Sequence, residues 1–247
     1  MACLFGGLRC CCTWRHLLID DEASCEYEAY FLAARSRLGR RFRTLEHGNR
    51  VRDEGVRRFA WAVPSRAALD CIAFHVASLC SATPSNAARV LDFGAGSGYW
   101  AHCVERHCAS LAPSVEAIDE QPQLYAGHSW FNVRKGGMPE LRAALGRSDA
   151  THGAAGAAPS TLLLLIWPTW GLPMAAEAAR LFHAKGGAVL VYVGEDRDGA
   201  TAAPDFFDEV ERSGRWCEEQ GTPVHCWFGR ADRLRVFKRS GLFRKNS

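Results

Sequence analysis

The stretch Val90–Trp100 reads VLDFGAGSGYW, and it decides the fold. A short apolar run leads into glycines at positions 94, 96 and 98, and a helical pattern follows them. A glycine-rich turn between a strand and a helix lets ligand atoms approach the backbone, and the free N–H groups of the helix point toward them. The stretch therefore predicts a ligand-binding turn at the end of a strand.

Two departures from common patterns narrow the ligand of this turn. The dinucleotide fingerprint G-x-G-x-x-G would place its third glycine at position 99, where this chain has Tyr99, and a P-loop would end in G-K-[ST], but the turn holds no lysine. Asp92, two residues before the first glycine, would repel a pyrophosphate but suits a ligand that carries an ammonium group. The methionyl end of S-adenosyl-L-methionine carries such a group.

A second acid is spaced for a ribose. Asp119 lies 21 residues beyond Gly98, at the end of the next predicted strand. At that spacing a carboxylate can accept hydrogen bonds from the two hydroxyls of an adenosine ribose. The alternative is a Rossmann-like domain that retains the turn for folding and binds no cofactor.

With these residues the chain resembles the class I S-adenosylmethionine-dependent methyltransferases from about Trp61 to its C-terminus. The resemblance implies a Rossmann-like α/β domain with a seven-stranded, mostly parallel sheet, an antiparallel last strand and helices on both faces. The cofactor-binding residues implied are Asp92, Gly94, Ala95, Gly96, Gly98, Tyr99, Asp119 and Glu120. WPTW at 167–170 and VYVGED at 191–196 further resemble a poorly characterised methyltransferase-like group that has WPPY and YIGE there.

The methyl acceptor is expected after the strand TLLLLI at 161–166. Adenine and amino-group methyltransferases have Asn or Asp, two prolines and an aromatic residue there, whereas this chain has Trp167, Pro168, Thr169 and Trp170. The polar acceptor is gone, so methylation of adenine N6 is not favoured. The two tryptophans either stack an aromatic substrate or cap the core. Catalysis is lost or altered in the rival hypothesis, a methyltransferase-like scaffold within a ribonucleoprotein assembly.

Two further pairs of side chains are candidates for a chemical role. Glu195 and Asp196, just beyond the strand GAVLVYV, would serve as a general base or orient a substrate, or they form a solvated carboxylate pair. Cys103 and His107 share a helix face, but no second pair of ligands has recognisable spacing. The sequence therefore predicts no metal site.

Strands alternate with helical patterns from residue 89 onward, which is typical of a mostly parallel sheet. The predicted strands are 89–93, 114–118, 131–134, 161–166, 187–193, 223–228 and 233–238, and the last two form an antiparallel hairpin. Ser65 is predicted to cap a helix that ends before the turn at 81–86. The domain division expected is an arginine-rich helical extension at 1–60 and the methyltransferase domain at 61–247.

The extension carries nine arginines between residues 35 and 58, whereas the whole chain has a net charge of only +3. Arginine forks bind phosphates, so Arg35, Arg37, Arg40, Arg41 and Arg43 predict an RNA or ribonucleoprotein partner, with a solvated face as the alternative. The 11 cysteines include no evident disulfide framework, and no apolar run is long enough for a membrane span. We expect an intracellular protein, because the cysteines read as reduced thiols. It is cytoplasmic or mitochondrial, and the mitochondrial alternative rests on the acid-free first nineteen residues, which weakly resemble a presequence.

Overall fold

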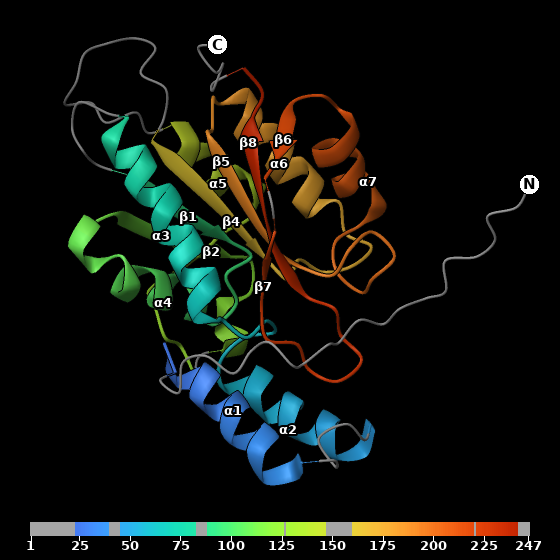
Figure 1. Ribbon diagram of the computed structural model, residues 1–247. Coiled ribbons are helices and arrows are strands. Elements are labelled where there is room, and N and C mark those ends of the chain that lie inside the picture. The colour runs from blue at the N-terminus through green and yellow to red at the C-terminus, as the bar shows by residue number, and fades with distance from the viewer. Residues whose placement is uncertain are drawn as a thin grey trace, which may run out of the picture.

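The computed structural model describes residues 23–39, 45–82, 88–125, 127–146, 160–219 and 221–241 (Figure 1). Two predicted features lie outside these ranges: the expected presequence, and the arginines at 40, 41 and 43. None of the helices in the described ranges combines the length and the apolar character that a bilayer crossing requires.

A single mixed sheet forms the centre of the molecule. Its described strands are β1 (Arg89–Phe93), β2 (Ser114–Asp119), β3 (Val133–Lys135), β4 (Thr161–Ile166), β5 (Val189–Gly194), β6 (Trp216–Glu218), β7 (Thr222–Pro223) and β8 (Arg233–Arg239). The order is β3-β2-β1-β4-β5-β8-β6, and β7 also pairs with β8. Strands β1 to β5 are parallel, whereas β8 runs antiparallel to β5. The order reverses between β1 and β4, which is where open α/β sheets bind ligands.

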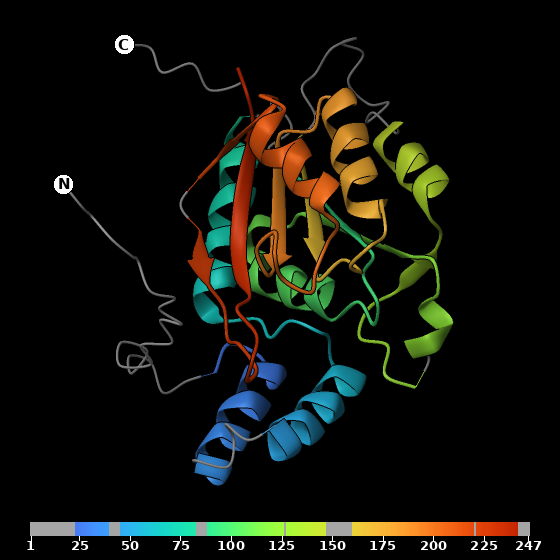
Figure 2. The same ribbon diagram turned by 90° about the vertical axis from the view of Figure 1, so that its right-hand side faces the viewer.

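The helices cover both faces of this sheet. They are α1 (Glu26–Leu38), α2 (Leu45–Arg58), α3 (Arg66–Ser81), α4 (Tyr99–His107), α5 (Met138–Gly146), α6 (Met174–Ala184) and α7 (Pro204–Phe207), with a π-helical turn at Asp208–Arg212. Helices α3 and α4 lie on one face, and α5, α6 and α7 lie on the other (Figures 1 and 2). The β4 leucines alternate between the two resulting cores, Leu162 and Leu164 in one and Leu163 and Leu165 in the other.

The expected fold class is confirmed, and one predicted strand is wrong. Only Pro223 of the segment 223–228 belongs to the two-residue β7, and an isolated bridge joins His225 to Val63. His225 and Trp227 are buried against α1 instead, where Trp227 meets Phe31 edge-on at 4.9 Å. Strand β6 at Trp216–Glu218 takes a place beside β8 that the sequence pattern did not indicate.

The capped helix is confirmed, since the Ser65 Oγ accepts a hydrogen bond from the Ala68 N–H at 3.2 Å at the start of α3. Helices α1 and α2 lie beyond the carboxyl ends of the parallel strands (Figure 2). Tyr27 and Phe31 of α1, together with Phe59, are fully or almost fully buried and belong to the same core cluster as Val90 of β1. One of the two main cores therefore continues across the expected domain boundary at residue 60.

Candidate functional site

The glycine turn takes a backbone conformation that favours glycine at all three positions. Gly94, Gly96 and Gly98 have φ values of 77°, 55° and 75°. The N–H groups of Gly94 and Ala95 donate to the Ile118 carbonyl at 2.9 and 3.1 Å, which joins the turn to the end of β2. A Cβ on Gly98 would lie 2.7 Å from side-chain atoms of Phe131 and Val133. Positive φ and close packing thus require glycine here.

A cavity of about 500 Å³ opens at this turn. It lies at the carboxyl ends of β1, β2 and β4, with further walls from α6 and from the segment after α2. Its lining includes Asp92, Gly94, Ala95, Gly96, Ser97, Asp119, Glu120, Tyr125, Trp61, Trp167, Pro168, Thr169, Leu172, Met174 and Glu177. No lysine, arginine or histidine is among the described residues that line it.

Asp92 is the most unusual group in this cavity. Its side chain is 1% exposed, and neither carboxylate oxygen meets a hydrogen-bond donor in the described part of the chain. Burial, with the nearby charge of Asp119, raises the pKa of Asp92 to about 7. A buried carboxylate without a partner is costly, so the site fits a cationic donor that reaches the mouth of the turn.

Asp119 is held in place by two backbone donors. Its Oδ2 accepts from the Gly96 N–H at 2.9 Å, and its Oδ1 accepts from the Gln121 N–H at 2.7 Å. Each carboxylate oxygen can accept a further hydrogen bond, so the side chain is oriented but still able to bind hydroxyls. Glu120 lines the cavity beside it. The structure thus brings Asp92, Gly94, Ala95, Gly96, Asp119 and Glu120 together around one cavity.

Two of the expected cofactor residues, Gly98 and Tyr99, do not line the cavity. The fully buried ring of Tyr99 packs edge-on against Phe59 at 5.1 Å and Trp130 at 4.9 Å. Its hydroxyl accepts from the Tyr27 N–H at 2.9 Å. As the first residue of α4, Tyr99 directs its ring toward α1 and away from the ligand side. Its placement gives it a packing role.

The segment after α2 forms a wall of the cavity that sequence reasoning missed. Three donors from the α/β domain hold its carbonyls: Ser97 Oγ bonds to Phe59, Trp100 Nε1 to Ala62 at 3.0 Å and Trp130 Nε1 to Arg58 at 2.7 Å. Trp61, between these anchors, lines the cavity and is 43% exposed. The sequence signal for this wall was Trp61 itself, an aromatic residue directly after the predicted domain boundary at residue 60.

Trp167 is fixed at the end of β4. Its φ of 52° is left-handed, which is rare for a bulky residue and marks local strain. Its indole stacks on Trp61 with ring centroids 4.8 Å apart and planes 6° apart, and its Nε1–H donates to Asp232 at 2.8 Å. Pro168 also lines the cavity, whereas Trp170 is 58% exposed and does not.

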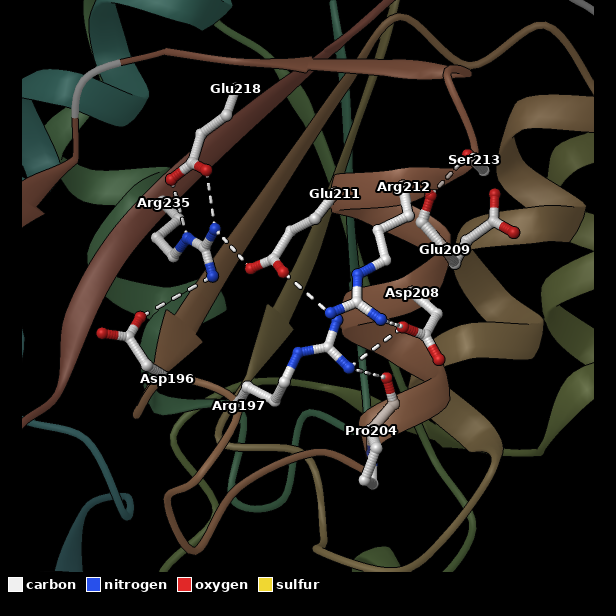
Figure 3. Close-up of polar contacts among 10 residues, drawn as sticks. All are labelled: Asp196, Arg197, Pro204, Asp208, Glu209, Glu211, Arg212, Ser213, Glu218 and Arg235. Atoms are coloured by element: carbon white, nitrogen blue, oxygen red, sulfur yellow. Dashed lines mark hydrogen bonds and ion pairs between the residues drawn. The ribbon is translucent and has the colours of Figure 1, made fainter.

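Glu195 and Asp196 are engaged in structural contacts away from the cavity lining. The Glu195 carboxylate accepts from the Ala200 N–H at 2.7 Å and the Ala231 N–H at 3.1 Å. Asp196 belongs to an ion-pair network around Arg235, which also holds Glu211 and Glu218 (Figure 3). The predicted solvated pair fits Asp196 alone, because Glu195 is buried, and neither carboxylate lines the cavity as a catalytic base would.

The remaining candidates are scattered. Cys103 lies on the buried face of α4, and His107 pairs with Asp70 of α3 at 2.7 Å. Among the described residues no group of three potential metal ligands comes together. Arg35 and Arg37 lie in the last turn of α1, and Arg40, Arg41 and Arg43 fall outside the described ranges. The structure therefore does not show these five arginines as one surface, and the RNA partner stays a prediction.

The chain has only distant similarities to known proteins, and these are to solved structures. No protein-family model matches the chain, and no curated protein matches its sequence. Among solved structures, cofactor-bound Rv0187 from MTB has a TM-score of 0.47 at 13% identity, covering 90% of this chain and 92% of that one. The mitomycin 7-O-methyltransferase MmcR has a TM-score of 0.38 at 14% identity, covering 87% and 69%.

A third structure, WbdD, has a TM-score of 0.41 at 16% identity and covers 69% of this chain, which spans only 34% of WbdD. At these TM-scores and identities, the function is inferred from the chain's own residues alone.

Proposed function

We propose that this protein is an S-adenosyl-L-methionine-dependent methyltransferase. The observation that carries the proposal is Asp92, a buried carboxylate without a hydrogen-bond partner among the described residues, which lines the same cavity as the anchored acid Asp119. An ammonium group would compensate the charge of Asp92, and ribose hydroxyls would bond to Asp119. The absence of basic side chains among the described lining residues argues against a pyrophosphate cofactor.

The bound cofactor would supply a methyl group on a sulfonium, which is already an activated leaving group. The chain's own task is then mainly positional. The glycine turn, Asp92 and Asp119 would hold the cofactor, while Trp61, Trp167, Leu172 and Met174 exclude water from the acceptor side. Glu177, exposed on α6 at the edge of the cavity, is a carboxylate that could orient an acceptor. RNA remains one predicted source of the acceptor.

Calorimetry with S-adenosyl-L-methionine tests this proposal on the full chain. We expect saturable one-site binding by the unmodified protein and no binding by Gly96→Arg, whose side chain would enter the cavity beside Tyr125. Gly214→Arg is the matched control, because Gly214 has a similar φ of 72° but nothing within 4 Å of an added Cβ. Both variants carry the same backbone strain, so only the loss at Gly96 reports the site.

The possible outcomes separate the two hypotheses carried from the sequence. Failure of the unmodified protein to bind the cofactor would overturn the enzyme proposal. Binding without methyl transfer to RNA, protein or small-molecule pools would instead support the scaffold hypothesis, for which the replacement of the family's polar residue by Trp167 is the motivating observation.

A further inference from the structure

Among the described aromatic residues that line the cavity, Phe93 and Trp100 are buried, and Tyr125 lies beside Gly96, where the cofactor is proposed to bind. The two others, Trp61 and Trp167, stack on each other. Trp167 is already engaged, since it stacks on Trp61, donates to Asp232 and lies 5.4 Å from the Arg230 guanidinium. Trp170 is exposed but lies off the cavity lining. Trp61 has one stacking partner, is 43% exposed and lines the cavity. It is therefore the ring available to a ligand.

We propose that Trp61 binds the methyl acceptor by stacking, and that the acceptor presents a planar aromatic ring that is neutral or cationic. This proposal rests on the proposed function, because it assigns the second substrate of the same cavity. Trp61 comes from the segment that joins α2 to α3, at the junction of the expected extension with the domain.

The rigidity of the stack supports a binding role. Ser97, Trp100 and Trp130 hold the carbonyls on both sides of Trp61, so its backbone is fixed to the glycine turn and to α4. Behind it, Asp232 fixes the Trp167 indole through Nε1 at 2.8 Å. A ring that is held in advance loses little conformational entropy when a ligand stacks on it. Asp232 is accordingly a positioning residue that acts through Trp167.

The charge of the cavity defines the acceptor further. The described lining contains the carboxylates Asp92, Asp119, Glu120 and Glu177 and no basic side chain. An acceptor with a phosphate or carboxylate inside the cavity would be repelled, whereas a neutral or cationic ring would not. The open face of a tryptophan also attracts cations. A free small aromatic molecule and an unstacked nucleobase share this chemistry.

Calorimetry with 2-naphthol tests the stacking site, and 2-decalol, its saturated, non-planar counterpart of similar size with the same hydroxyl, is the control. We expect naphthol to bind the unmodified chain more tightly than decalol, and Trp61→Ala to weaken naphthol binding about tenfold. Trp61→Phe should retain most of the affinity. Phe74→Ala removes a 64%-exposed ring of α3 away from the cavity and should change nothing. Equal affinities for the two probes, or unchanged naphthol binding by Trp61→Ala, would overturn the proposal.

Two further arms complete the experiment. Asp232→Ala should weaken naphthol binding and Asp232→Asn should restore it, because the amide oxygen still accepts from Trp167; a purely structural role would give no such rescue. Single-stranded octa-adenylate distinguishes the source: a loss with Trp61→Ala assigns a nucleobase, and no loss beside a naphthol loss assigns a small aromatic. S-adenosylhomocysteine titrated into the unmodified chain reports the cofactor site separately, so its failure would not be confused with failure of the ring site.

Discussion

Asp92 is an acid held where its charge is penalised. Its pKa rises to about 7 because it is buried and because Asp119 is nearby. The folded state therefore retains a proton that the unfolded state has lost, and the resulting stability is fully present below about pH 4. That stability is lost as the pH rises through about 7. Asp232, whose pKa burial also raises to about 7, acts in the same direction.

Replacing Asp92 by Asn should have opposite effects on stability and on cofactor binding. Without ligand at pH 8, Asp92→Asn should be more stable than the unmodified chain by up to about 4 kcal/mol, since no charge is buried. Its affinity for S-adenosyl-L-methionine should fall roughly tenfold or more, because a neutral amide oxygen accepts a hydrogen bond from the ammonium but does not offset its charge. Thermal unfolding from pH 4 to 8 and calorimetry measure the two effects.

Asp70→Asn, which alters an exposed carboxylate on α3, serves as the control for this pair of measurements. Equal cofactor affinity in Asp92→Asn and the unmodified chain would show that Asp92 does not face the ligand's cation. A pH profile of stability that is the same in both would show that Asp92 is not the buried proton acceptor.

At the scale of elements, α1 is anchored by a buried polar contact. Glu28 Oε1 bonds to His225 Nε2 at 2.6 Å, and Oε2 accepts from the Ser24 N–H at 2.7 Å. Burial raises the pKa of Glu28, but the bonds from His225 and Ser24 outweigh it and lower the value to about 2. The contribution of this carboxylate is thus present above about pH 4.5 and is lost as the pH falls through about 2.

Removing this anchor should loosen α1 from the domain. We expect Glu28→Ala to lower the free energy of unfolding by about 3 kcal/mol, because His225 is left buried without its partner. Hydrogen exchange of the α1 amides should accelerate more than exchange in β4. Glu105→Ala, an exposed glutamate on α4, is the comparison variant. If α1 exchanges at its original rate in Glu28→Ala, the helix is held by its apolar contacts alone.

At the scale of the whole molecule, the N-terminal helices complete a core and also a cavity. The buried aromatic rings Tyr27, Phe31 and Phe59 pack into the cluster on the α3–α4 face, and Trp61 reaches the ligand side. Full burial of three such rings contributes roughly 5–9 kcal/mol. That is comparable with the entire stability of an ordinary domain. The division at residues 60 and 61 is therefore a division of sequence pattern, and independent folding of 61–247 is not expected.

Truncation tests this dependence. A chain that begins at residue 61 should lack a cooperative thermal transition and should expose apolar surface to a hydrophobic dye, whereas a chain that begins at residue 23 should unfold cooperatively. The first lacks Tyr27, Phe31 and Phe59, and the second keeps every described residue. A sharp transition in the shorter chain, with cofactor binding intact, would contradict this interdependence.

The sequence by itself determined the glycine turn, the acids Asp92 and Asp119 that line the cavity with it, and the course of the parallel strands. Positive φ at Gly94, Gly96 and Gly98 is a local property that glycine spacing encodes, and the apolar runs specify strands through the burial of consecutive residues. These features are readable because each depends on neighbours along the chain.

Only the tertiary structure decided which side chains line the cavity. Tyr99 follows the glycine turn yet packs against α1, Glu195 follows β5 yet bonds to the Ala200 and Ala231 amides, and Trp61 precedes the domain yet lines the cavity. Each outcome depends on contacts between residues far apart in sequence, such as Trp61 with Trp167 and Tyr99 with Tyr27. Periodicity assigns a residue to an element, but the packing of that element against distant segments sets the direction of its side chain.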